Sequence, residues 1–195
     1  MSSPRIPLKA KVLFVVLLAL LVVLAYLSAG LINNLLEGLI GGDLQTRFGT
    51  PVVEEFLKSL GLLVLTLIYL KRVRLGFLES LEVNYMIGFL LGGLFGVLEN
   101  VFTYEFFTGL RSVTSLIHAL ATGIIGIGFY FVISEGVKGV KKLFSTYLIA
   151  ILIHSTWNNL VSIESIIPLA TMAITITIIG LTTFWCSYYR YQVKK

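Results

Sequence analysis

The chain has 195 residues, of which 57% are hydrophobic and 13% charged, and its mean hydropathy is +0.95. Soluble domains have an apolar share nearer to about half, so this composition excludes an ordinary soluble protein and indicates an integral membrane protein. Several spans of about 20 residues leave no room for a sizeable soluble domain. We therefore expect one membrane domain over residues 1–195.

The formal net charge of +5 and the single cysteine exclude further classes. Basic residues of membrane proteins gather in cytoplasmic loops, so the positive charge reflects topology and predicts no nucleic-acid partner. Cys186 alone excludes an internal disulfide and a cysteine-rich metal cluster.

The first predicted element is a span over about residues 12–32, preceded by three basic residues. Its apolar run is longer than the roughly 7 to 15 residues of a signal-peptide core, so we expect an uncleaved membrane helix. Residues 33–50 then lower the hydrophobicity with Gly41-Gly42, Asp43 and Arg47. This segment predicts a loop that carries a short amphipathic helix.

The second predicted span covers residues 51–70, with Thr50 as its N-cap and Pro51 at the first helical position. It ends at the basic segment 71–74. The apolar residues of segment 75–84 indicate a helix lying in the membrane interface.

Four further spans follow, at about residues 85–107, 112–134, 143–161 and 166–189. The third span carries Gly88, Gly92 and Gly96 at every fourth position, a pattern that allows close helix packing. With a cytoplasmic N-terminus, twelve of the 15 Lys and Arg residues lie on the cytoplasmic side: three in each terminus, three in 71–74 and three in 138–142. The prediction is an all-α polytopic helix bundle in the cell membrane, with six spans and both termini cytoplasmic.

Three charges interrupt the second span: Glu54, Glu55 and Lys58. Each ionisable side chain in a membrane helix costs roughly 2.5 to 3.5 kcal/mol, so such groups usually have partners and a function. Near a helix N-terminus, however, the macrodipole favours anions, and a structural role explains these two glutamates equally well.

The depths of the other polar residues argue for a site. With a helical rise of about 1.5 Å per residue, Glu54 and Glu55 lie about 5 Å below the outer surface. Glu99, His118 and His154 lie about 10 Å below the same surface, and Asn158 is shallower. A lone membrane histidine more often bonds a neighbouring helix than acts as a catalyst. The shared depth instead predicts an inward polar cavity that opens to the outer surface.

Four segments in these spans resemble the successive motifs of the PrsW intramembrane proteases, within the CAAX-protease and bacteriocin-processing superfamily. The segments are 54–58 (EEFLK), 95–100 (FGVLEN), 111–118 and 154–159 (HSTWNN). The superfamily carries a paired-glutamate motif, an F-x-x-x-H motif and an H-x-x-x-N motif. Here Glu99 replaces the histidine of the CAAX branch and Lys58 gives a tighter E-E-x-x-K spacing, both of which favour the PrsW branch. In bacterial examples, the resemblance implies cleavage of a membrane-anchored anti-sigma factor on its extracytoplasmic side.

The hypothesis that follows is an intramembrane endopeptidase acting on a membrane-anchored protein substrate in the lipid bilayer. Either Glu54 or Glu55 is the general base toward water, because crowded carboxylates separate in proton affinity. His154 and Asn158 would stabilise the oxyanion, and the remaining candidates, His118 and Glu99, would orient or protonate groups around the water.

Metal dependence stays open at the level of the sequence. His118, His154 and one or two of the three glutamates are acceptable zinc ligands, although the H-E-x-x-H motif of zincins is missing and the chemistry does not require a metal. A small ion-coupled transporter or channel could use the same polar layer, and a non-catalytic protein that binds membrane helices is a third alternative.

Overall fold

The computed structural model describes residues 8–71, 75–103 and 109–161, together with positions 174, 178, 179 and 182. Every regular element in these ranges is helical, which confirms the predicted all-α class. The helices are α1 (Leu8–Ile40), α2 (Gly42–Leu44), α3 (Thr50–Lys58), α4 (Leu60–Leu70), α5 (Leu81–Phe102), α6 (Gly109–Glu135) and α7 (Gly139–Val161).

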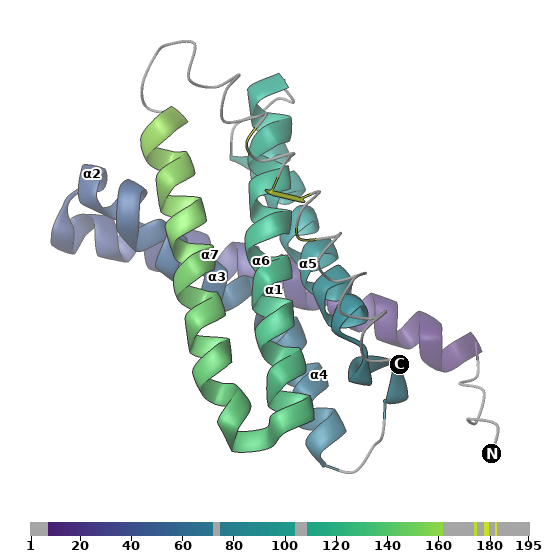
Figure 1. Ribbon diagram of the computed structural model, residues 1–195. Coiled ribbons are helices and arrows are strands. Elements are labelled where there is room, and N and C mark those ends of the chain that lie inside the picture. Colours follow the sequence, from purple (N-terminus) through teal and green to yellow (C-terminus); the bar gives the residue numbers. More distant parts are fainter. Residues whose placement is uncertain are drawn as a thin grey trace, which may run out of the picture.

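The helices α5, α6 and α7 pack side by side and form the centre of the molecule (Figure 1). A short turn, Gly136–Lys138, reverses the chain between α6 and α7, and Gly136 there adopts a φ of +62° that favours glycine. The predicted glycine stripe lies between α5 and α6. A Cβ at Gly92 would come within 2.2 Å of the His118 carbonyl oxygen. This close approach brings the α5 and α6 site residues together.

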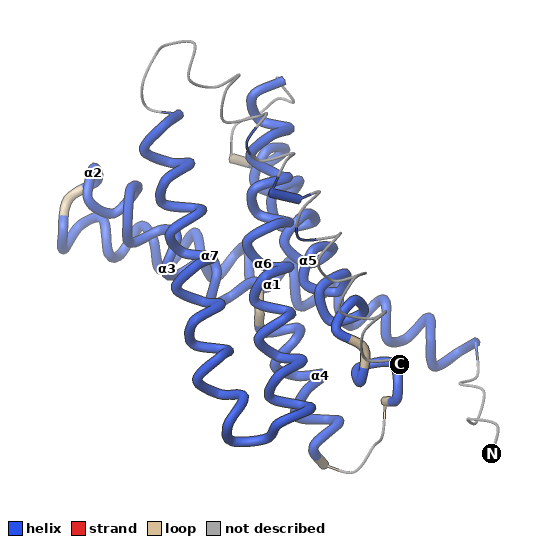
Figure 2. Tube along the Cα trace, viewed as in Figure 1, coloured by secondary structure: helices blue, strands red, loops and turns tan. Residues whose placement is uncertain are grey.

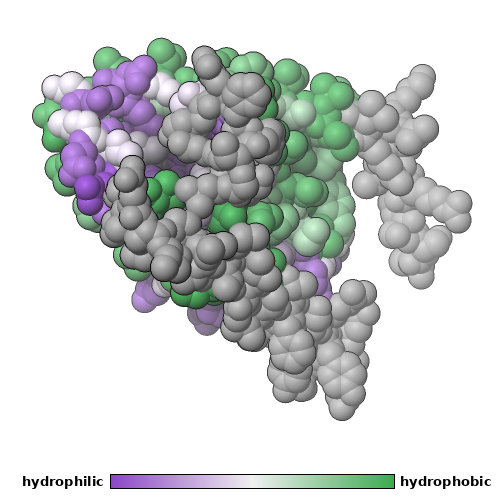
Figure 3. All heavy atoms as spheres, turned by 90° about the horizontal axis from the view of Figure 1, so that it is seen from above, coloured by the Kyte–Doolittle hydropathy of each residue, from purple (hydrophilic) through white to green (hydrophobic). Residues whose placement is uncertain are grey.

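Helix α1 crosses behind the α6–α7 hairpin and packs against α3 and α5 (Figures 1 and 2). Its buried side chains Val22, Ala25 and Ala29 join Leu57 and Phe95 in the main apolar core. Many large apolar side chains of α1 point outward, as expected of a helix in lipid. Hydrophilic atoms gather instead on the side of the molecule where α2 lies (Figure 3).

Three stretches of the described chain are long and apolar enough to cross a membrane: Leu13–Ile40, Leu81–Phe102 and Val113–Val161, the last of which covers most of α6 and all of α7. These stretches and the composition make the chain a membrane protein. Six spans with both termini in the cytoplasm remain a prediction, and most of the predicted sixth span, 166–189, lies outside the described residues.

Several predicted boundaries are wrong. Helix α1 continues to Ile40 rather than ending near residue 32. A π-helical segment, η1 (Gln45–Gly49), then leads directly into α3. Because the backbone is already helical before Thr50, this residue is inside the helix and is not its N-cap. Pro51 lies in the first turn of α3, one position after the predicted first helical position.

The second predicted span is interrupted at Ser59, between α3 and α4. The Ser59 hydroxyl donates to the Phe56 carbonyl at 2.8 Å and also hydrogen-bonds with the Tyr147 hydroxyl of α7. In place of the predicted interfacial helix the chain forms one 3₁₀ turn, Gly76–Glu79, and α5 begins earlier than expected, at Leu81.

Candidate active site

Four helices deliver the predicted carboxylates and imidazoles to one buried cluster. Glu54 and Glu55 come from α3, Glu99 from α5, His118 from α6 and His154 from α7. All except Glu99 are nearly inaccessible to solvent, and Glu99 is largely covered. The convergence that the sequence predicted is therefore observed.

Glu55 is held on all sides. Its Oε1 accepts from Lys58 Nζ at 2.6 Å and from His154 Nδ1 at 2.9 Å, and its Oε2 accepts from the Thr122 hydroxyl at 3.1 Å. Thr122 was not predicted, although it stands one helical turn after His118 on the same face of α6. With these donors in place, Glu55 orients its neighbours and does not face the cavity.

The hydrogen bonds of His118 define its tautomer. Lys58, as an ammonium, can only donate, so His118 Nδ1 accepts from Lys58 Nζ at 2.7 Å. His118 Nε2 therefore carries the proton and donates to Glu99 Oε2 at 2.8 Å. No role in the site was predicted for Lys58 from the sequence, yet Lys58 links Glu55 to His118 inside the cluster.

His154 has the opposite tautomer. Its Nδ1–H donates to the Glu55 carboxylate at 2.9 Å, so its Nε2 carries a free lone pair. This Nε2 lies 3.9 Å from Glu54 Oε2. The His118 and His154 rings stand perpendicular with their centroids 4.6 Å apart. Each imidazole is thus fixed by a carboxylate through one nitrogen and turns the other toward the centre of the cluster.

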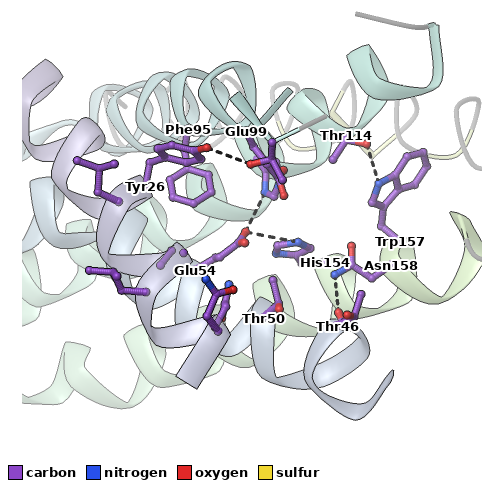
Figure 4. A pocket seen from close by; sticks show the side chains of 18 of the residues that line it. Tyr26, Thr46, Thr50, Glu54, Phe95, Glu99, Thr114, His154, Trp157 and Asn158 are labelled. Carbon is purple, nitrogen blue, oxygen red and sulfur yellow. Dashed lines mark hydrogen bonds and ion pairs between the residues drawn. The ribbon is translucent and has the colours of Figure 1, made fainter. Parts of the chain in front are cut away.

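Glu54 is the carboxylate that faces open space. Its Oε2 is buried, lies 3.8 Å from Lys58 Nζ and 4.0 Å from His118 Nδ1, and accepts no hydrogen bond from the described residues. Buried carboxylate oxygens normally have a donor. This one borders a cavity of about 800 Å³ (Figure 4).

The cavity is lined by α1, η1, α3, α5, α6 and α7. Tyr26 closes the α1–α5 seam: its hydroxyl hydrogen-bonds with that of Thr103 at 3.0 Å, and its ring packs edge-on against Phe95. The α1 residues that line the cavity are mixed: four are apolar (Leu27, Ala29, Gly30 and Leu31) and three are polar (Tyr26, Asn33 and Asn34). The carboxylate and imidazole groups of the cavity come from the other helices, where Glu54, Glu99 and the histidines meet it.

Asn158 lines the same cavity one helical turn after His154, and its hydrogen bond is made outside the carboxylate–imidazole cluster (Figure 4). Its Nδ2 donates to the Thr46 carbonyl of η1 at 2.9 Å. The adjacent Asn159 accepts from Arg47 Nη1 at 3.1 Å. These two bonds fasten η1, which precedes the glutamates, to the end of α7.

One further property of the cluster concerns metals. Glu54, His118 and His154 each offer a ligand atom, and these atoms lie within 4.8 Å of one another. Two histidines and one glutamate are a common ligand set for catalytic zinc. Each histidine also donates a hydrogen bond to a carboxylate from the N–H of its other ring nitrogen, as metal-bound histidines usually do.

The fold and the site together define an all-helical membrane protein with a buried glutamate–histidine centre that opens into a cavity. A family model described as PrsW family intramembrane metalloprotease matches residues 7–185, so the chain belongs to this family. The resemblance noted in the sequence is confirmed, and the chain is an intramembrane protease domain. Comparison with curated proteins and with solved structures gives no significant match.

Proposed function

We propose that this protein is an endopeptidase that hydrolyses a peptide bond of a membrane-anchored protein substrate, with Glu54 as the base that activates water. The observation that carries the proposal is the free Oε2 atom of Glu54 at the wall of the cavity. Every other charged group of the cluster is already engaged in a hydrogen bond. Among the described carboxylates of the cluster, Glu54 is the one with a buried oxygen that accepts no hydrogen bond, so it is the best placed to take a proton from water.

A water molecule between Glu54 and His154 would meet two acceptors. The 3.9 Å between Glu54 Oε2 and His154 Nε2 suits one water that donates a hydrogen bond to each atom. Glu54 would take the proton as the water oxygen attacks the scissile carbonyl carbon, and would then pass this proton to the leaving amine. Glu55 fixes the tautomer of His154, so the Nε2 lone pair stays directed at the water.

The developing oxyanion needs a donor on the cavity wall. The Asn158 side-chain nitrogen carries two hydrogens, and only one is used on Thr46. The second is available to an oxygen in the cavity. This assignment keeps Asn158 as the oxyanion donor and makes His118, paired with Glu99, a positioning residue for the centre.

The same residues fit a divalent metal ion. Glu54 Oε2, His118 Nδ1 and His154 Nε2 would hold it, and with all carboxyls ionised the cluster has three negative charges against one ammonium, a formal excess that such an ion would balance. When bound, the ion would act as a Lewis acid toward a carbonyl oxygen and lower the pKa of a bound water. The family description names a metalloprotease.

We place the cleavage near the extracytoplasmic face. The lysines at the α6–α7 turn, Lys138, Lys141 and Lys142, belong on the cytoplasmic side by the positive-inside rule. His118 stands 17 residues before the end of α6, so the site is roughly 25 Å from this turn along the helix. This distance supports a site in the opposite leaflet.

The test is reconstitution of the purified protein with membrane-anchored peptides that are fluorescently labelled at either end. Cleavage in the outer third of the spanning segment, lost in Glu54→Gln, is the expected result. Mass spectrometry of the products gives the cleavage position. Cleavage within the cytoplasmic third would refute the proposed side, and full activity of Glu54→Gln would refute the proposed base.

A further inference from the structure

Lys58 is the feature of the cluster that general base catalysis leaves unexplained. Its Nζ is fully buried, bonded to Glu55 Oε1 at 2.6 Å and to His118 Nδ1 at 2.7 Å. The ammonium also lies 4.9 Å from the centre of the Phe95 ring. Four contacts, with two carboxylates, one imidazole and one aromatic face, hold this cation in place.

The bond to His118 conflicts with metal binding. An imidazole nitrogen has a single lone pair, which can accept an N–H or bind a metal ion but cannot do both. His118 Nδ1 is the nitrogen that faces Glu54, at 4.0 Å, and its lone pair is engaged by Lys58. The other nitrogen, Nε2, already donates to Glu99.

We infer that Lys58 controls the metal affinity of the site: it lowers the affinity for divalent cations by occupying the ligand nitrogen of His118. The inference rests on the metal-binding capacity described under the proposed function. A cation that enters the site must move Lys58 Nζ away from His118 Nδ1 and meets a like charge 3.8 Å from the Glu54 ligand oxygen. Both effects weaken binding, and both disappear when the ammonium is removed.

Lys58 has little room to withdraw. Its side chain is closed off from solvent, and moving it would deprive buried Glu55 of its shortest contact. A buried carboxylate that loses its cationic partner is strongly destabilised. The Lys58–Glu55 pair therefore keeps the ammonium in place against a weakly bound cation.

The test compares metal binding by the purified, chelator-treated protein and by Lys58→Met, which keeps the length of the side chain without the donor. Co²⁺ is titrated and followed by its visible absorption, and Zn²⁺ is then added as a competitor. We expect Lys58→Met to bind Co²⁺ at least about tenfold more tightly than the wild type. The matched control Lys58→Arg, which retains the charge and the donors, should stay within about threefold.

A second variant covers the case in which Lys58→Met does not fold. Lys58→Met combined with Glu55→Gln removes one positive and one negative charge, and the glutamine oxygen can still accept from His154. This double variant should bind Co²⁺ at least about tenfold more tightly than Glu55→Gln alone. Adding His118→Gln to either Lys58→Met variant should abolish the gain.

Equal Co²⁺ affinity with and without Lys58 would overturn the inference. If no variant binds Co²⁺, the metal-binding capacity fails and the inference fails with it. Peptide hydrolysis measured in the same preparations, with Glu54→Gln as the inactive reference, reports separately on the proposed protease function.

Discussion

The two adjacent glutamates should respond in opposite ways to the same substitution. In Glu54→Gln, the carboxylate that faces the cavity loses its ability to take a proton, while no hydrogen bond from a described residue is lost. Loss of a general base lowers the rate by about 10²- to 10⁴-fold. Glu54→Gln also removes the charge 3.8 Å from Lys58 Nζ, but Lys58 keeps its 2.6 Å contact with Glu55. The free energy of unfolding should therefore fall by no more than about 1 kcal/mol.

Glu55→Gln should instead act mainly on stability. It removes the charge that pairs with buried Lys58 at 2.6 Å and leaves Glu54 Oε2, at 3.8 Å, as the nearest carboxylate. Breaking a buried ion pair costs about 3 to 5 kcal/mol. At about 2 to 4 °C per kcal/mol for a chain of this size, Tm should fall by roughly 6 to 20 °C. The glutamine oxygen still accepts from His154, so cleavage below the lowered Tm should persist.

Thermal unfolding in detergent and cleavage of a fluorogenic membrane peptide, measured on both variants, decide the matter. Glu54→Gln should be stable and inactive, and Glu55→Gln unstable and active. The reasoning is refuted if the two variants lose stability equally, or if Glu55→Gln is as inactive as Glu54→Gln at a temperature where it remains folded.

Three further outcomes are expected. Gly92→Ala should lower Tm and activity together, because the new Cβ would come within 2.2 Å of the His118 carbonyl oxygen. The control Gly93→Ala, whose Cβ would meet its nearest neighbour at 3.5 Å, should leave Tm and activity nearly unchanged, and thermal unfolding of the two variants checks this. Asn158→Ala should reduce kcat by about 10²-fold with little change in KM. Asn159 forms its hydrogen bonds outside the cavity lining, so the control Asn159→Ala should keep kcat, and equal losses of kcat in the two variants would contradict the oxyanion assignment. Wild-type hydrolysis should continue in the presence of a chelator, and elemental analysis of the same sample should show less than one metal ion per chain. Loss of activity in the chelator and its restoration by Zn²⁺ would contradict activation of water by Glu54 without a metal ion.

Local sequence rules account for the membrane class, the long helices and the common depth of the polar residues. Hydropathy identifies the apolar stretches, and the fixed rise per residue converts positions 99, 118 and 154 into similar depths once the direction of each helix is assumed. Hydropathy and the rise per residue depend only on residues that are close together in the sequence. The glycine stripe of α5 is predictable for the same reason, since close helix packing requires small residues at a helical period.

The interruption at Ser59 and the helical η1 segment were not predictable in this way. Ser59 is bonded to Tyr147 and Thr46 to Asn158, contacts between residues far apart in the chain. The sequence from residue 45 to 70 does not indicate which distant residues these side chains and carbonyl groups contact. The predicted N-cap at Thr50 failed because tertiary contacts hold the preceding residues in a helical conformation.

The sequence by itself predicted that two adjacent glutamates, a third glutamate and two histidines lie at similar depths on different helices, and the structure brings these residues into one cluster. Only the tertiary structure distinguishes Glu54 from Glu55. Adjacent residues of a helix point about 100° apart, so one faces the cavity while the other faces the neighbouring helices. The packing of α3 against α1, α6 and α7 turns Glu55 toward Lys58, His154 and Thr122 and leaves Glu54 at the cavity wall.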